Sequence, residues 1–139
     1  MQKKIIIHLI MSVKKTSMPW NDLYGNSRKL YPGRSFYPIC IKSFNKRPKI
    51  RKGICQSKQR YYISSGLIWI IPLLFFLRMR IKRKQLIWHI HNPSLSFCGP
   101  LIRLFMRDSK VILNLHNLYA KYNFYQRLIY RFSMPFCHK

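Results

Sequence analysis

The sequence predicts one α/β domain built on a largely parallel sheet flanked by helices. Near the amino terminus, the unbroken apolar run IIIHLI is typical of a strand buried on both faces. Residues 85–136 alternate strand-like and helix-like segments with short links, which is the pattern of parallel βαβ units. A chain of 139 residues also suffices for a single hydrophobic core.

The first half is expected to be the less regular one. Residues 3–11 form the first strand, and 16–60 hold only a short helix at 26–30 and a strand at 35–43. Pro38 indicates an edge strand or a strand start, because proline donates no ladder hydrogen bond. We predict a basic surface loop at 45–60, since its many Lys and Arg residues show no periodicity.

The most apolar run of the chain is GLIWIIPLLFFL at residues 66–77. It is shorter than the ~20 residues that span a bilayer, it contains Pro72, and a cationic block follows it. We expect a helix that packs into the core, with insertion into a membrane interface as the alternative and a true span as the least favoured. The alternative gives a membrane-surface role to Trp69, Arg78, Arg80, Lys82, Arg83 and Lys84.

The second half is expected to alternate strands and helices. The strands are residues 85–91 and 110–116, and the helices are residues 95–107 and 122–136. Ser94 is placed to cap the first of these helices. We take residues 66–139 as the best-supported part of a single partial domain.

The charge balance is extreme: 27 Lys and Arg stand against two acids, for a formal net charge of +25. Such a charge suits binding to nucleic acid, attraction to an anionic membrane, or a piece of a larger protein whose acids lie elsewhere. The two acids are Asp22 and Asp108, and the absence of Glu excludes the H-E-x-x-H zinc proteases.

The four cysteines, Cys40, Cys55, Cys98 and Cys137, lie far apart and form no C-x-x-C pair. Zinc sites built from cysteine require closer spacing. We therefore expect no metal site.

Polar residues gather where two predicted strands end. His89, His91 and Asn92 close one strand, and His116 and Asn117 close the next. In an open parallel sheet, ligands bind outside the carboxyl ends of the strands. Alternation along the strand is taken to point His89 away from His91, toward the core or a helix. His91 and His116 suit equally a binding site or a structural group at a strand end.

The segment IWHIHNPSLSF, followed after one helix by VILNLHN, resembles the family 4 glycosyltransferases of bacterial surface-polysaccharide synthesis. The similarity covers residues 66–139, with residues 3–12 as a matching first strand. It implies a Rossmann-like fold, of which residues 1–139 form an incomplete part: the amino-terminal, acceptor-side half of a two-domain enzyme. The second domain, which binds the nucleotide sugar in that family, is missing from this chain.

The resemblance also implies roles for particular residues. His116 would line the cleft near the transferred sugar, where it orients the acceptor or stabilises developing charge. His91, Asn92 and Asn117 would form the floor of the acceptor site.

The implied activity is transfer of a sugar from a nucleotide donor to a membrane-linked polysaccharide or glycolipid precursor. This chain would hold no cofactor and be inactive alone, since the donor belongs to the missing domain or to a separate chain. The resemblance places it in the cytoplasm, peripheral on the anionic inner face of the membrane. Two alternatives remain: a non-enzymatic basic protein that binds membrane or nucleic acid, and a degenerate product that does not fold stably. No nucleic-acid motif appears, so a nucleic-acid partner is disfavoured.

Overall fold

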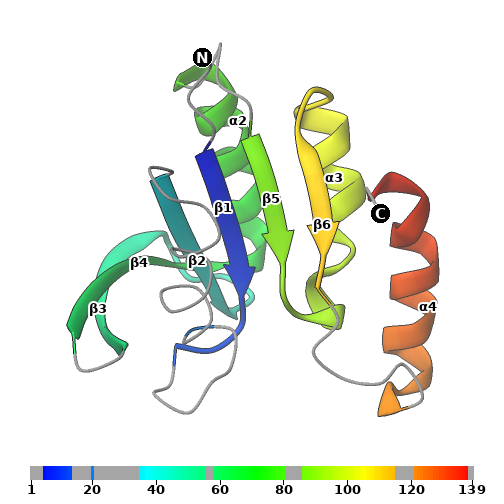
Figure 1. Cartoon of the computed structure of the whole chain (residues 1–139), viewed down its shortest axis with the longest axis horizontal. Helices are drawn as coiled ribbons and strands as arrows, with labels where there is room; N and C mark the ends of the chain where they lie inside the picture. Colours follow the sequence, from blue (N-terminus) through cyan, green and yellow to red (C-terminus); the bar gives the residue numbers. More distant parts are fainter. Residues whose placement is uncertain are drawn as a thin grey trace.

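Six strands form a single sheet in the order β3-β4-β2-β1-β5-β6, with helices against it (Figure 1). The structure is a computed structural model that describes residues 5–13, 20, 35–55, 58–80, 86–114 and 121–137, leaving out the side chains of 35–37, 55 and 58. The strands are β1 (Ile5–Ile10), β2 (Ser35–Ser43), β3 (Lys49–Cys55), β4 (Lys58–Gly66), β5 (Leu86–Ile90) and β6 (Lys110–Leu113). The α-helices within these ranges are α2 (Ile70–Arg80), α3 (Cys98–Phe105) and α4 (Phe124–Ser133). Short 3-10 turns are η1 (Leu67–Trp69), η2 (Pro93–Leu95) and η4 (Met134–Phe136).

Strand β1 lies near the middle of the sheet, parallel to β2 on one side and to β5 on the other. All six of its residues are buried, as the unbroken aliphatic run predicts. The chain builds outward from β1 toward β4 and β3, and then returns to add β5 and β6 on the opposite side. The strand order therefore reverses between β1 and β5. The predicted α/β class is confirmed, and the arrangement is consistent with a Rossmann-like fold.

Different hydrophobic clusters pack on the two faces of the sheet. On one face, Ile7 and Leu9 of β1 join Trp88 of β5 in a core closed by α2 and α3. On the other face, Ile10 packs with Trp20 and Tyr62, and the Trp20 indole donates to the Ile54 carbonyl at 2.8 Å. Because side chains alternate along a strand, the residues between the helix-facing ones point to this second face.

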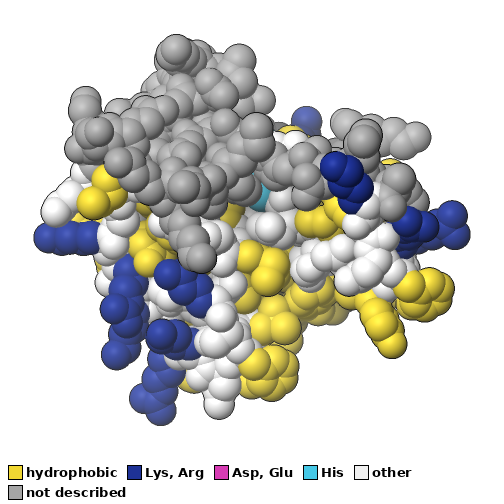
Figure 2. Space-filling model, turned by 90° about the horizontal axis from the view of Figure 1, so that it is seen from below, with side chains coloured by type: hydrophobic (Ala, Val, Ile, Leu, Met, Phe, Trp, Pro, Cys, Tyr) yellow, Lys and Arg dark blue, Asp and Glu magenta, His cyan; other side chains and the backbone are white. Residues whose placement is uncertain are grey.

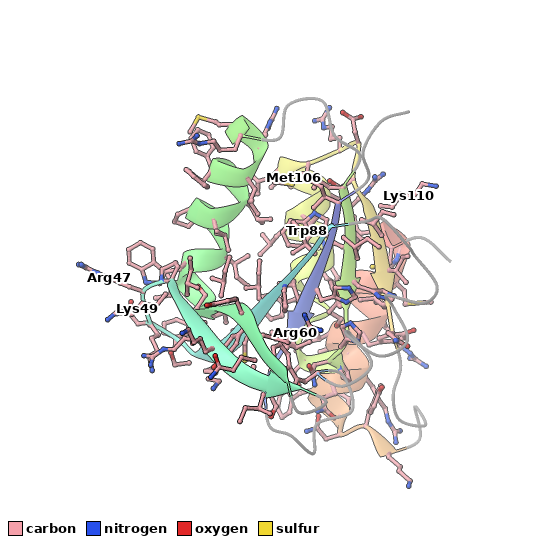
Figure 3. All side chains as sticks on the ribbon, turned by 60° about the vertical axis from the view of Figure 1, so that its left-hand side comes forward. Arg47, Lys49, Arg60, Trp88, Met106 and Lys110 are labelled. Carbon is pink, nitrogen blue, oxygen red and sulfur yellow. The ribbon has the colours of Figure 1, made fainter. Side chains whose placement is uncertain are left out.

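Helices α2 and α3 cover the sheet with a few fully buried side chains. Leu74 of α2 and Ile102 of α3 are each 0% exposed, and Trp88 lies at 1%. In Figure 3, Trp88 and Met106 point into the space between the sheet and these helices. Helix α4 begins at an Asn123 capping box, in which Gln126 donates its backbone N–H to the Asn123 side chain at 2.8 Å.

The segment 45–60, predicted as a basic surface loop, is basic and largely exposed where the structure describes its side chains, but it is not a loop. Strand β3 and the start of β4 form an antiparallel hairpin there, with Arg51 opposite Tyr62. Most β3 side chains are exposed, including Ile50 at 77%, so no inside–outside alternation marks the strand in the sequence. Arg47 and Lys49 point outward from this edge of the sheet (Figure 3), where charged side chains discourage pairing with another molecule.

Two further expectations need correction. Strand β2 lies inside the sheet, between β4 and β1, although Pro38 indicated an edge strand or a strand start. The β2–β4 ladder begins only at Ile39, so Pro38 is paired with β1 alone. Ser94 does not cap α3, whose N-cap is Phe97. The Ser94 hydroxyl instead accepts a hydrogen bond from Gln126 Nε2 at 3.3 Å.

The remaining predicted elements agree in type and differ in length. The apolar run at 66–77 becomes η1 and α2, and no α-helix in the described ranges is long and apolar enough to cross a bilayer. Strands β5 and β6 and helices α3 and α4 fall within their predicted ranges. The short helix expected at 26–30 lies outside the described residues.

Candidate functional site

The carboxyl ends of β1 and β5 are tied together by two hydrogen bonds beyond the strands themselves. The backbone N–H of His91 donates to the Leu9 carbonyl at 3.0 Å. The backbone N–H of Met11 donates to Oδ1 of Asn92, also at 3.0 Å. His91 and Asn92 are therefore held at the point where the strand order reverses, which is where open α/β sheets bind ligands.

Three histidines meet beside this point, and we call them the histidine cluster: His8, His89 and His91. His8 and His89 are partners in the parallel register of β1 and β5. The ring centroids are 5.3 Å apart for His8 and His89, 5.1 Å for His8 and His91, and 5.0 Å for His89 and His91. The three rings thus form a nearly equilateral triangle on the sheet face opposite α2 and α3.

The prediction that His89 points away from His91 was wrong. Side chains alternate along a strand with a period of two, so residues 89 and 91 share a face. The backbone of β5 follows this rule: Leu86, Trp88 and Ile90 are buried in the core against the helices. The alternation that places these three residues in the core brings His89 and His91 together on the other face.

Burial controls the charge of the cluster. His8 is 1% exposed and His91 is 3% exposed, whereas His89 is partly exposed. Burial, reinforced by the neighbouring His91 and His89, lowers the pKa of His8 from 6.5 to about 2. His8 is therefore a neutral imidazole at physiological pH. Its Nδ1 lies 2.8 Å from Nε2 of His91, a hydrogen bond in which one ring donates and the other accepts.

No family model matches the chain, and no curated protein or solved structure is similar to it. The site is therefore interpreted from its own geometry and from the sequence resemblance.

The structure describes only some of the predicted site residues. His91 and Asn92 lie just after the end of β5 and are hydrogen-bonded to Leu9 and Met11 at the end of β1. The predicted site residues that fall outside the described residues are His116, Asn117, Lys82, Arg83 and Lys84. The described end of β6 approaches the same edge, because the Asn114 N–H donates to the Ile90 carbonyl at 2.8 Å.

The described members of the predicted membrane surface are spread along α2. Trp69 precedes the helix, whereas Arg78 and Arg80 lie in its last turn, about 14 to 16 Å further along the axis at 1.5 Å per residue. Between them, Ile71, Phe75, Phe76 and Met79 are exposed. The Arg80 guanidinium lies 5.4 Å from the centre of the Phe76 ring. The exposed part of α2 is thus apolar and basic together.

A groove of about 580 Å³ opens beside the last turn of α2, lined by Arg78, Leu86, Leu104 and Asp108 among others. Leu86 begins β5, whereas His91 follows its end. The groove and the histidine cluster therefore lie at opposite ends of this strand.

His8 was not among the site residues predicted from the sequence. It is the one polar residue within the aliphatic run of β1, and a histidine in such a run must be either partnered or functional. Strand register was needed to place it opposite His89, because 81 residues separate the two in the sequence.

Proposed function

We propose that this chain is the acceptor-binding half of a glycosyltransferase that moves a sugar from a nucleotide donor to a membrane-linked polysaccharide or glycolipid precursor. The observation that supports this most directly is the position of His91 and Asn92. Both residues lie at the carboxyl ends of parallel strands, at the reversal of strand order. The resemblance of residues 87–97 and 111–117 to family 4 glycosyltransferases supplies the reaction class.

The chemistry of these groups suits an acceptor. Oδ1 of Asn92 is engaged by the Met11 N–H, which fixes the side-chain amide and its two Nδ2 hydrogens in place. Such an amide donates hydrogen bonds to a phosphate or a sugar hydroxyl. His91 supplies an imidazole ring next to it, fixed by the hydrogen bond of its Nε2 with His8 Nδ1. In this proposal the donor is bound by a second domain or a separate chain, and His116 and Asn117 complete the site.

A peripheral position on the inner face of the cytoplasmic membrane follows from the same proposal. It is supported by the exposed Phe75 and Phe76 of α2 beside Arg78 and Arg80. Phenylalanine rings on the apolar face of a helix insert at the boundary between headgroups and acyl chains, and each Lys or Arg near an anionic surface contributes about 1 kcal/mol.

A short-chain polyprenyl diphosphate sugar, soluble in water, tests the acceptor site. We expect it to shift the backbone amide resonances of Met11, His91 and Asn92 in the purified chain. Asn92→Asp keeps the acceptor for Met11 but replaces the donor hydrogens with a negative charge. Binding should weaken about tenfold or more, since a hydrogen bond to a charged group contributes about 1.5–3 kcal/mol.

Asn123→Asp is the matched control, because it makes the same charge change at the α4 cap and aspartate is an equally good cap. Equal weakening by the two variants, or no shift at residues 91 and 92, would refute the acceptor site. Turnover of a nucleotide sugar by the purified chain would contradict its inactivity alone.

The second candidate is a non-enzymatic basic protein that binds membrane or nucleic acid. The exposed basic side chains around β3, including Arg47, Lys49 and Arg51, favour it. Such a protein would bind DNA or anionic vesicles with a strong salt dependence and would ignore the acceptor analogue. Measuring the binding of the acceptor analogue and of DNA or anionic vesicles to one sample separates the acceptor-binding function from the non-enzymatic one.

A further inference from the structure

We propose that the histidine cluster is a binding site for Zn²⁺ or a similar late divalent cation, held by one ring nitrogen from each of His8, His89 and His91. One ligand nitrogen of each ring lies within 4.8 Å of those of the other two. No carboxylate or thiol is needed to complete this set. The inference goes beyond the proposed function and does not depend on sugar transfer.

The distances are close to those of a filled site. Zn–N bonds of about 2.0–2.1 Å in a tetrahedral site place two ligand nitrogens about 3.3–3.4 Å apart. His8 Nδ1 and His91 Nε2 are nearer than this, at 2.8 Å, and the widest pair is within 4.8 Å. Binding would therefore exchange the His8–His91 hydrogen bond for two metal bonds, with ring movements of about 1 Å.

The backbone that carries the rings is already fixed. His8 and His89 sit side by side in the β1–β5 ladder, and the His91 N–H is bonded to Leu9 of β1. Ligands on paired strands lose little freedom when they bind, so the site requires no rearrangement of the chain.

The ligand type selects the metal. Neutral imidazole suits Zn²⁺, Cu²⁺, Ni²⁺ and Co²⁺, whereas Mg²⁺ and Ca²⁺ require oxygen ligands that the cluster lacks. Three protein ligands leave one position open on a tetrahedral ion. The three imidazoles leave the charge of the ion uncompensated, and the chain carries +25. The open position therefore favours an anion such as phosphate.

The cluster has a route to solvent. His89 is only partly buried, unlike His8 and His91. In Figure 2, which looks toward the carboxyl ends of the parallel strands, a small area of histidine is visible. The cluster is therefore open to solvent from this edge of the sheet.

The test is a titration of the tag-free protein with Co²⁺, followed by displacement with Zn²⁺. We expect one equivalent to give the visible bands of a cobalt ion with nitrogen ligands. His89→Ala removes the most exposed ligand and should weaken binding by more than the roughly 10- to 100-fold typical of losing an outer-shell partner. Cys40→Ser is the matched control. Cys40 is a buried residue of β2, paired with Ile10 of β1, and is not a ligand in this site.

Three results would overturn the site: no saturable binding, a thiolate-to-cobalt band, or binding unchanged in His89→Ala. Should that variant fail to fold, the imidazole ¹⁵N resonances of the unmodified protein decide the question. Zn²⁺ must then shift three histidines together, and a shift of fewer than three would refute the proposal. Loss of the acceptor analogue's binding leaves these readouts untouched, so the two proposals fail separately.

Discussion

Nδ1 of His8 lies 2.8 Å from Nε2 of His91, joining two neighbouring strands through a pair of buried imidazoles. Neither ring can take up a proton there without breaking this bond or placing a charge beside its neighbours. The cluster therefore links the protonation of the protein, its stability and its capacity for metal.

The first prediction concerns pH. Folded His8 has a pKa of about 2, whereas the same residue in the unfolded chain titrates near 6.5. Between these values the unfolded chain binds more protons, so the free energy of unfolding falls as pH falls below 6.5. His8 contributes a slope of up to about 1.4 kcal/mol per pH unit. Urea unfolding from pH 7.5 to 5, with a chelator present, measures it.

His8→Gln provides the comparison for this prediction, because glutamine does not titrate in this range. Its free energy of unfolding should depend less steeply on pH than that of the unmodified protein. Identical slopes would show that His8 is protonated at the same pH in both states.

The second prediction concerns metal removal. A cation that binds only the folded cluster adds about 2.7 kcal/mol of stability when its free concentration is 100 times Kd. Zn²⁺ should therefore raise Tm, and a chelator should return Tm to its starting value. Mg²⁺ at the same concentration serves as the control and should have no effect, since imidazole is a poor ligand for it. Stabilisation by both ions would indicate a nonspecific effect.

The third prediction concerns α2 and membranes. Replacing the exposed Phe75 and Phe76 with serine should weaken binding to vesicles that contain anionic lipid by about a hundredfold or more, because each ring that inserts into the membrane contributes about 1.5–3 kcal/mol. Cosedimentation with vesicles measures this. Ile50→Ser with Ile54→Ser removes a similarly exposed apolar pair from the basic hairpin and should have little effect. Equal losses would mean that α2 has no special role.

The fourth prediction concerns Gly66, where β4 ends. A Cβ on this residue would meet backbone atoms of Phe44, Asn45 and Lys46, and its N–H donates to the Lys46 carbonyl at 2.6 Å. Backbone cannot move aside cheaply, so Gly66→Ala should cost about 1–3 kcal/mol in urea unfolding.

Gly99→Ala is the control for Gly66. A Cβ there meets the Cys137 sulfur at 3.0 Å and a Val111 methyl group at 3.7 Å, both of them side-chain atoms. Alanine also favours the helix that contains residue 99 by about 1 kcal/mol. We expect Gly99→Ala to change the free energy of unfolding little. A larger loss of stability than that of Gly66→Ala would contradict this prediction.

The sequence predicted the elements with strong periodicity or a long apolar run. Strand β1 and helix α2 were predicted from their apolar composition. Strand β5 and helix α3 were predicted because strand-like and helix-like segments alternate in this part of the chain. The β3–β4 hairpin was not predictable in this way, because β3 is exposed on both faces and its side chains show no alternation. Its pairing with β4 depends on backbone hydrogen bonds, which leave little trace in the sequence.

The site was predicted in part for a similar reason. His91 and Asn92 were found because they follow a strand, which the local sequence reveals. His8 was not found, because its partnership with His89 depends on which strands are neighbours in the sheet. The orientation of His89 follows from strand alternation alone, because residues 89 and 91 are two apart and share a face of β5.

The division of the sheet into a helix-covered face and a histidine-bearing face has a practical consequence for engineering. Position 89, the partly exposed member of the histidine cluster, can be randomised in a library while the residues that pack against α2 and α3 stay constant. Selection for thermal resistance can likewise be confined to the helix-covered face. The two searches share no positions, so a robust scaffold can be obtained first and new binding chemistry installed on it afterwards.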